Sequence, residues 1–479
     1  MTFARERRWA LVVWTAAVAW ATGVFAMARL EYLNFRLAYY DLGNMVQAVW
    51  STAHGRPLEG TLSTGEQAVR LGGHVDPILA LFAPLWWAAP SPLLLAGVQV
   101  ATVALGALPI YWLGCRHLEL EKAAALLALA YLLYPWLAWT AIDAFHPVTL
   151  AIPLLLYAAW FLDSHRLGAF VACAVLVAAT SELMGFAIAG LGMWYWLARA
   201  RPRAGIRITV AGIGWTVICL KVIIPAFGGT SNSFASHYSS VGGSPEGIVW
   251  TLITDPGAIL TAVTSGRDAW YVLWLTAPLV GAFMLAPGMA AIAVPQLAVN
   301  TLTDLQTATD PRHHYVAGLI PFLFAASAMG IARLRFSLRT SAAAAVLSVT
   351  AVFALILGPW PALPGPGPAR IHPYVTARHV NALRAAVALV PEGVAVSTTN
   401  TAGSHLAERR YLFTIPVVRQ AEWIVLDGGD PWMGVHGSLP EGLYPERLRA
   451  FRSRIQRNPE WHLVFERDGV AVFRRVSLP

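Results

Sequence analysis

Charged residues are scarce in this chain of 479 residues: they make up 13% of the sequence, while hydrophobic residues make up 57%. Soluble globular proteins typically carry about 25% charged residues. A deficit of this size, spread over hundreds of residues, excludes an ordinary soluble protein and indicates one embedded in lipid. Cysteine is also scarce. The three present, Cys115, Cys173 and Cys219, lie far apart in or beside apolar segments, so we interpret them as small apolar fillers.

Several sequence motifs are missing as well. There is no Walker A motif, no G-x-S-x-G motif and no G-x-G-x-x-G motif that opens a soluble nucleotide-binding fold. These absences argue against an ATP-driven motor and a Rossmann enzyme. The net charge of +8 comes largely from basic residues beside apolar segments and from an Arg-rich tail, so it does not indicate nucleic-acid binding.

Apolar segments of roughly 20 residues recur along the chain, which is the length that crosses a bilayer as a helix. Lipid cannot hydrogen-bond the backbone, so these segments must be helices, and the alternating pattern of a membrane barrel is absent. The first segment is too long for the apolar region of a signal peptide, so we predict an uncleaved span. The candidate spans, eleven in all, are residues 9–29, 93–114, 121–139, 147–162, 168–181, 183–198, 206–226, 270–286, 288–302, 315–332 and 340–360.

Basic residues predict how these spans are oriented. Arg5, Arg7 and Arg8 precede the first span, and basic loops follow the second, fourth, sixth and tenth. With eleven spans, all these loops fall on one side, which should be the cytoplasm because cytoplasmic loops are enriched in Lys and Arg. We therefore predict a multi-pass protein of the bacterial cytoplasmic membrane with a cytoplasmic N-terminus and an extracytoplasmic C-terminal domain.

The predicted membrane domain covers residues 1–362. Within it, residues 30–92 form a long outer loop, with one helix that stops near Gly55 and a second, Pro-broken helix that lies at the membrane interface. A Pro/Gly linker follows at 363–372. Charges become frequent in residues 373–479, where "GVAVST", "EWIVLD" and "WHLVFERDGVAVFRR" predict strands and "HVNALRAAVALV" predicts a helix. This region is predicted to be a small soluble α/β domain outside the membrane.

Ionisable groups beside membrane spans are costly to bury and therefore indicate function. Asp41, in "DLGN", has two interpretations. It is either a helix N-cap, or a general base that Asn44 and Gln47 assist from the same helical face. Asp143 and His146 lie three residues apart in "IDAFHP". They form either a capped turn or a site in which Asp143 is a second carboxylate and His146 contacts phosphate or carries a proton.

Other polar residues of the predicted outer face are more ambiguous. His74 and Asp76, in "HVDP", are candidates for a metal site, but their spacing matches no known ligand motif. Residues 312–314, "RHH", form either an interfacial anchor or a binding site for a lipid-linked phosphate. Glu182 is either paired within the bundle or part of the site. We predict Asp41 and Asp143 as catalytic residues; those predicted to bind substrate or phosphate are Asn44, Gln47, His54, His74, Asp76, His146, Glu182, Arg312, His313 and His314.

Several long blocks resemble one family of bacterial membrane proteins, known as domain of unknown function 2079. They include "YYDLGNMVQAVWSTAHGRP", "GGHVDPILALFAPLWW", "IDAFHP" and "VSTTNTAGSHLAERRYLFTIP". That family is similar in layout to the GT-C superfamily of membrane glycosyltransferases. The resemblance implies a polytopic helical fold of about 11 spans with a soluble outer domain. It also implies a catalytic Asp in the first outer loop and a further acid in the second, which Asp41 and Asp143 match.

The GT-C resemblance implies a sugar donor on a polyprenyl phosphate, an inverting displacement with Asp41 as general base, and a leaving phosphate that basic groups such as Arg312 and His313 stabilise. The expected partners are membrane lipid, this donor and a glycan, lipid or protein acceptor. No cofactor is established, and a divalent metal has no support from residue spacing.

Two other functions stay open: a transporter or flippase of a lipid-linked or envelope component, and a non-catalytic envelope assembly protein. Transporters favour charges near the bilayer midplane and internal repeats. Here the charges gather at one predicted face, and no repeat between the two halves is evident. In the tail, His405, Arg409 and Arg410 could contact glycan or the catalytic loop, or lie in an exposed turn.

Overall fold

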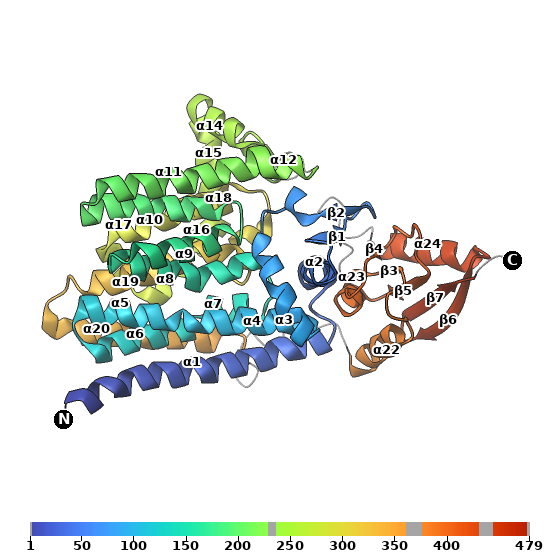
Figure 1. Ribbon diagram of the computed structural model, residues 1–479, viewed down its shortest axis with the longest axis horizontal. Helices are drawn as coiled ribbons and strands as arrows, with labels where there is room; N and C mark the ends of the chain where they lie inside the picture. The colour runs from blue at the N-terminus through green and yellow to red at the C-terminus, as the bar shows by residue number, and fades with distance from the viewer. Residues whose placement is uncertain (1, 229–235, 361–375, 431–443, 477–479) are drawn as a thin grey trace.

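The computed structural model describes residues 2–228, 236–360, 376–430 and 444–476. Figure 1 shows a bundle of long helices joined to a smaller domain built on a β-sheet. The N-terminus and the sheet domain lie at opposite ends of the molecule. The predicted linker, residues 363–372, lies outside the described residues.

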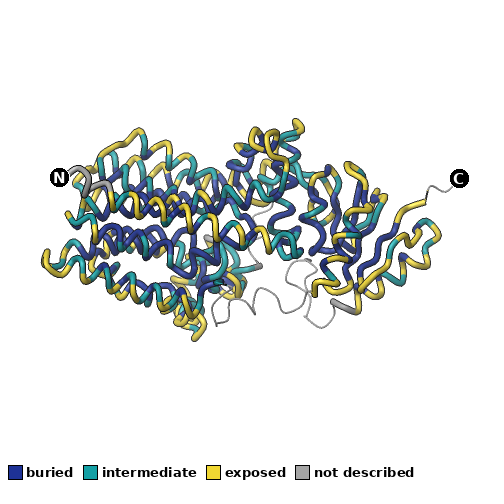
Figure 2. Tube along the Cα trace, turned by 90° about the horizontal axis from the view of Figure 1, so that it is seen from below, coloured by how far each residue is buried: buried dark blue, intermediate teal, exposed yellow. Residues whose placement is uncertain are grey.

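The helices of the bundle run roughly side by side, and buried residues lie both inside the bundle and inside the sheet domain (Figure 2). Tyr131, Tyr134 and Trp136 are fully buried in the core of the bundle. The main helices are α1 (Thr2–Leu33), α4 (Pro92–Leu105), α5 (Ala107–Leu118), α6 (Glu121–Leu133), α7 (Pro135–Ile142), α8 (Ala151–Asp163), α9 (Leu167–Ala178), α10 (Met184–Arg199), α11 (Pro202–Ile218), α14 (Pro245–Thr254), α15 (Pro256–Val263), α16 (Gly266–Thr276), α18 (Val294–Leu302), α19 (Ile320–Ile331) and α20 (Phe336–Leu357).

Fewer helices than predicted are long and apolar enough to cross a membrane. Among the described residues there are five, and a sixth if α6 and α7, which bend by 46° at their junction, count as one span. The five are Arg8–Leu33, Pro92–Leu118, Pro202–Ala226, His314–Ile331 and Phe336–Leu357.

Several of the eleven predicted spans therefore correspond to helices shorter than those that pass this length test. Three apolar helical stretches, Pro77–Ala88, Pro147–Asp163 and Leu167–Ala178, are only 10–17 residues long. The predicted spans 270–286 and 288–302 are divided into short helical pieces. Pro278, Pro287 and Pro295 lie within this region, and each proline removes a backbone hydrogen bond that a continuous helix needs.

The first long loop is compact and ordered, as its sequence predicted. A π-helical turn, η1 (Tyr39–Gly43), leads directly into α2 (Asn44–Ala53), and Gly55 follows with the positive φ of 78° that favours glycine. The antiparallel strands β1 (Glu59–Thr61) and β2 (Gln67–Val69) come next. The Pro-broken segment then forms η3 (Pro77–Phe82) and α3 (Ala83–Ala88).

The C-terminal domain contains a mixed sheet in the order β4-β3-β5-β7-β6. Strand β3 pairs in parallel with β4 and β5, whereas β7 is antiparallel to β5 and β6. The predicted strands at β3, β5, β6 and β7 and the predicted helix α22 are present, and β4 was not predicted. The bounds are α22 (Ala377–Ala388), β3 (Val396–Thr398), α23 (Asn400–Gly403), β4 (Leu412–Thr414), β5 (Trp423–Asp427), α24 (Tyr444–Arg457), β6 (Trp461–Arg467) and β7 (Val470–Arg475).

A buried ion cluster ties three helices together at the end of the bundle away from the sheet. The carboxylate of Asp163, at the end of α8, is fully buried. It lies 2.9 Å from Arg116 Nε and 3.0 Å from His117 Nε2, both on α5, and it pairs with Arg199 on α10. The sequence placed these residues in three loops predicted to share one face. Their convergence supports that part of the topology.

We expect Asp163→Ala to destabilise the bundle by about 1–3 kcal/mol, because three partly exposed basic side chains lose the buried carboxylate that they share. Thermal unfolding of the protein in lipid nanodiscs measures this as a lower midpoint. The matched control is Glu246→Gln, which breaks an exposed pair with Lys221 at 2.6 Å and should change little. An unaltered midpoint for Asp163→Ala would show that the cluster is not a structural tie.

Candidate functional site

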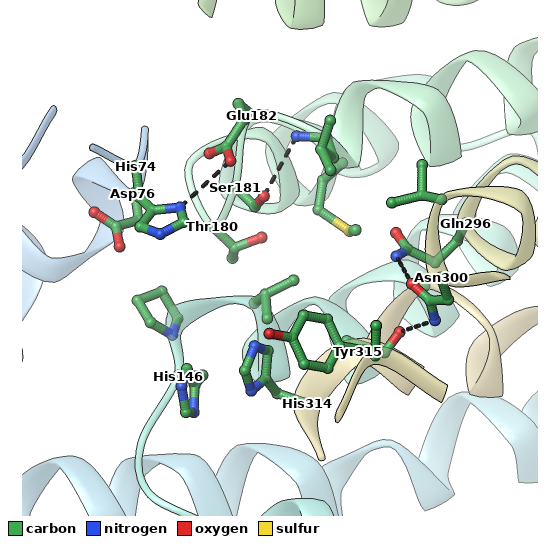
Figure 3. Close-up of a pocket in the computed structure, with 18 of the residues that line it drawn as sticks. His74, Asp76, His146, Thr180, Ser181, Glu182, Gln296, Asn300, His314 and Tyr315 are labelled. Carbon is green, nitrogen blue, oxygen red and sulfur yellow. Dashed lines mark hydrogen bonds and ion pairs between the residues drawn. The ribbon is translucent and has the colours of Figure 1, made fainter. Parts of the chain in front are cut away.

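A cavity of about 400 Å³ opens at the end of the bundle that faces the sheet domain. Such clefts with a few converging polar groups are the usual form of small-molecule sites. Its walls come from the first long loop, the turn after α7, the turn between α9 and α10, helix α18, and η11 (His314–Gly318) (Figure 3). Six predicted site residues line it directly besides Asp41: Asn44, His74, Asp76, His146, Glu182 and His314.

Asp41 lies in the π-helical turn η1, an uncommon backbone form that often marks functional sites. The interpretation of Asp41 as an N-cap is wrong. The N-cap residue is Ala38 for η1 and Gly43 for α2, and neither of these residues makes a side-chain capping hydrogen bond. The carboxylate instead faces His146, with Oδ1 3.6 Å from Nε2. About half of the Asp41 side chain is exposed, so a ligand in the cavity can reach it.

His146 is held in one orientation by its neighbours. Its Nδ1 lies 2.8 Å from the carbonyl of Ala144, so Nδ1 carries the proton and Nε2 is directed at Asp41. Its backbone N–H donates to Gln99 Oε1 at 3.1 Å. Burial alone would lower the pKa of His146, but the interaction with Asp41 and the charges of Asp41 and Asp143 outweigh it and raise that pKa. The carboxylate thus favours the protonated form of the His146 ring at the cavity.

Gln99 organises the turn that carries Asp143 and His146. Its side chain is fully buried on α4. Nε2 donates to the carbonyls of Ala141 at 3.2 Å and of Asp143 at 3.1 Å, while Oε1 accepts from His146. The sequence analysis did not single out this glutamine. A buried amide inside an apolar helix was the signal available, because such a group must find partners.

Asp143 stands behind the cavity and does not line it. Its Oδ2 lies 3.3 Å from His313 Nδ1, and its Oδ1 accepts from the backbone of Ala144 at 3.0 Å. Burial lowers the pKa of His313, but the hydrogen bond that Asp143 accepts from it and the nearby carboxylates reverse the effect, and the pKa is raised. Asp143 therefore favours the protonated forms of His146 and His313, and it does not reach a substrate in the cavity directly.

Arg312 and His313 also lie outside the cavity, contrary to their predicted role in phosphate binding there. Arg312 Nε donates to both carboxylate oxygens of Asp310, at 2.8 and 2.9 Å. It lines a separate groove of about 610 Å³, together with Trp270 and Trp274. Asp310 and Arg312 thus form an ion pair at this separate groove, and neither lines the cavity that contains Asp41.

The opposite wall supplies two ion pairs. Arg70 Nε bonds to Asp76 at 2.8 Å, and Arg70 Nη1 donates to Asn44 Oδ1 at 3.4 Å. His74 Nδ1 lies 3.4 Å from Glu182, whose other oxygen accepts from the backbone of Val75 (Figure 3). Arg70 was not predicted, although it precedes "GGHVD" in the same loop.

Two predicted binding residues, Gln47 and His54, do not reach the cavity. Gln47 is fully buried, and its Nε2 donates to the carbonyls of Arg409 and Arg410 in the C-terminal domain. His54 is exposed, and its ring packs against Trp50. Asn44 lines the cavity beside Asp41, whereas Gln47, further along α2, bonds to the C-terminal domain, so only part of the predicted helical face lies at the cavity.

The polar residues of the cavity wall formed by α18 were also not predicted. On α18, Gln296 Nε2 donates to Asn300 Oδ1 at 2.8 Å, and Asn300 Nδ2 donates to the carbonyl of Tyr315 at 3.0 Å (Figure 3). A pair of amides four residues apart in an otherwise apolar segment was the available signal, since i and i+4 share one helical face.

Asp143, His146 and His314 are the residues best placed to hold a metal ion in the described part of the chain, with one ligand atom each within 4.8 Å of the others. However, the rings of His146 and His314 stack at 3.6 Å with an interplanar angle of 18°. Nitrogen lone pairs lie in the ring planes, so near-parallel rings cannot both direct them at an ion about 2.0–2.1 Å away. The set does not fit a metal in this geometry. His74 and Asp76, each paired elsewhere, form no such group.

Two solved structures share this architecture. Both are of ArnT from Cupriavidus metallidurans, one bound to undecaprenyl phosphate and one in the apo state. The first has a TM-score of 0.53 at 12% identity and covers 96% of this chain and 97% of that one. The second has a TM-score of 0.52 at 13% identity and covers 96% and 98%. At this identity, the likeness concerns the fold.

A comparison with curated proteins found no match. The family described as "Predicted membrane protein (DUF2079)" matches residues 31–472. This range includes the first long loop, the cavity and nearly all of the C-terminal sheet. The chain is therefore a multi-pass helical membrane protein with an ArnT-like fold, and it belongs to the DUF2079 family.

Proposed function

We propose that this protein is a membrane glycosyltransferase, which moves a sugar from a polyprenyl-phosphate-linked donor to an acceptor hydroxyl with inversion at the anomeric carbon. One observation carries the proposal: Asp41, paired with His146, faces a cavity that also holds Arg70 and His74. A base and cationic groups in one cavity are what this displacement needs. That the ArnT fold accommodates undecaprenyl phosphate supports the choice of donor.

In the proposed step, the acceptor oxygen attacks the anomeric carbon while Asp41 accepts the hydroxyl proton. The bond between that carbon and the phosphate oxygen breaks on the opposite face, and polyprenyl phosphate leaves with the electron pair. His146 orients Asp41 before attack. Arg70, anchored through Nε by Asp76, still offers guanidinium N–H groups to the phosphate.

We assign the leaving phosphate to Arg70 and His74 and no longer to Arg312 and His313. The first two line the cavity that contains Asp41, whereas Arg312 lines the separate groove. His74 is about half exposed and can approach a ligand. The acceptor, whether glycan, lipid or protein, is left undefined, as is the sugar.

Asp41→Asn should lower transfer by about 100-fold or more, since a general base typically contributes that much. The measurement is release of polyprenyl phosphate from a radiolabelled polyprenyl-phosphate sugar by the protein in nanodiscs supplied with an envelope extract. The control is Glu66→Gln, an exposed acid of the same loop that lies outside the cavity. Wild-type turnover in Asp41→Asn would refute the general-base role and favour the transporter or assembly hypotheses.

The rate should also fall as the pH rises through the raised pKa of His146, because the protonated ring orients Asp41. Asp143→Asn removes one of the charges that raise this pKa, so the alkaline loss of activity should move to lower pH. A pH–rate profile of both proteins measures the shift. Asp304→Asn, at an exposed carboxylate bonded to Ser239 and Ser240, should leave the profile in place. If Asp143→Asn loses activity at the same alkaline pH as the wild type, the proposal that protonated His146 orients Asp41 is contradicted.

A further inference from the structure

The C-terminal domain packs directly onto the turn that carries Asp41. Helix α23 lies beside α2 in Figure 1, and the two share one hydrophobic core. Members from the first loop include Tyr39, Leu42 and Val46, while Ala402 and Leu412 come from the C-terminal domain. A loop next to the reacting groups is thus held by residues about 360 positions later in the chain.

One hydrogen bond in this contact has a specific consequence. The first turn of any helix leaves backbone N–H groups without an acceptor in that helix. In η1, where Ala38 provides no side-chain cap, the N–H of Tyr40 donates to Asn400 Oδ1 at 3.0 Å. Asn400 is almost fully buried. It acts as a helix cap supplied by another domain, on the residue immediately before Asp41.

Close packing limits how far the turn can move. Tyr39 lies against Gly403 so tightly that a Cβ on this glycine would collide with the tyrosine side chain. A Cβ on Gly43 would lie 2.8 Å from Tyr39 and 3.2 Å from the backbone of Ser404. The Tyr40 hydroxyl is also within 3.2 Å of Thr414 Oγ1. Shifting η1 therefore requires shifting the domain.

His405 anchors the same contact on the side of α1. Its ring stacks between Tyr32 and Phe35, at centroid distances of 4.1 and 3.9 Å, and its Nε2 lies 2.9 Å from the Tyr32 carbonyl. Burial lowers the pKa of His405 to about 4. The ring is consequently neutral across the neutral pH range, and the anchor does not loosen there.

We propose that Asn400 is a positioning residue: the C-terminal domain caps the π-helical turn and thereby fixes Asp41 opposite His146. The catalytic consequence rests on the proposed function, but the mechanical consequence does not. If the contact only joined two domains, loss of the Asn400 acceptor would not change hydrogen exchange in the turn. If Asn400 is a cap, its loss should speed exchange of the Tyr40 amide and its neighbours.

Hydrogen–deuterium exchange of the full-length protein in nanodiscs tests this. We expect Asn400→Leu to speed exchange of the Tyr40 amide by about tenfold or more. Asn400→Asp should restore slow exchange, because a carboxylate also accepts from a helix N-terminus. The matched control is Asn458→Leu: Asn458 Oδ1 accepts from Glu460 N–H at 2.9 Å in the same domain, away from η1.

Unchanged exchange at Tyr40 in Asn400→Leu, or an equal rise in Asn458→Leu, would overturn the proposal. Exchange across β3 and β5 reports whether the domain stays folded. If Asn400→Leu unfolds it, Asn400→Ala removes the acceptor with less bulk and is expected to give the same local increase. An unchanged Tyr40 amide in that variant is equally decisive.

A second readout concerns turnover. With saturating polyprenyl-phosphate sugar, Asn400→Leu should lower kcat about tenfold with little change in KM, and Asn400→Asp should recover it. Full activity alongside fast Tyr40 exchange would show that capping does not position Asp41 for catalysis. If Asp41→Asn itself is fully active, the proposed function fails, while the exchange result still decides the capping.

Discussion

The pairing of Asp41 with His146 is the interaction on which the rest of the site depends. The two groups come from different loops and meet at 3.6 Å. A carboxylate and an imidazole stay together at a cavity wall only if both backbones are held. Gln99 holds the turn that carries His146, and Asn400 caps the turn that contains Asp41. One support comes from the bundle and the other from the C-terminal domain.

Apolar and charged side chains occupy different parts of the bundle. Apolar helices form the body of the bundle, where backbone groups satisfy one another, as lipid requires. Charged groups collect at its ends. At one end, the buried carboxylate of Asp163 joins three helices through partly exposed basic side chains. At the other end, acids and histidines surround the cavity, and Asp41 and His74 are exposed enough for a ligand to reach them.

Much of this organisation could be predicted from the sequence. The membrane class, the long first loop, the strands of the tail and the gathering of polar residues near Asp41 follow from composition and periodicity. The roles of single residues could not be predicted. Arg312 was expected to bind phosphate, but it lines a groove separate from the cavity that contains Asp41. Gln47 was expected at the site, but it binds backbone carbonyls of a distant domain.

These differences arise from contacts that spacing along the chain does not reveal. Gln47 lies on the same helix as Asn44, yet its partners belong to the C-terminal domain. The predicted spans differ from the observed helices because apolar composition does not reveal where prolines divide a segment. Gln99 and Asn400 act through contacts between segments far apart in the chain, which spacing within one segment does not reveal.

The most direct test of the central claim is a cryo-electron microscopy structure of the full-length protein in nanodiscs with undecaprenyl phosphate. Our account predicts phosphate density in the cavity beside Asp41, within hydrogen-bonding distance of Arg70 and His74. Phosphate bound instead in the groove beside Arg312, or no density in the cavity at saturating lipid, would contradict it.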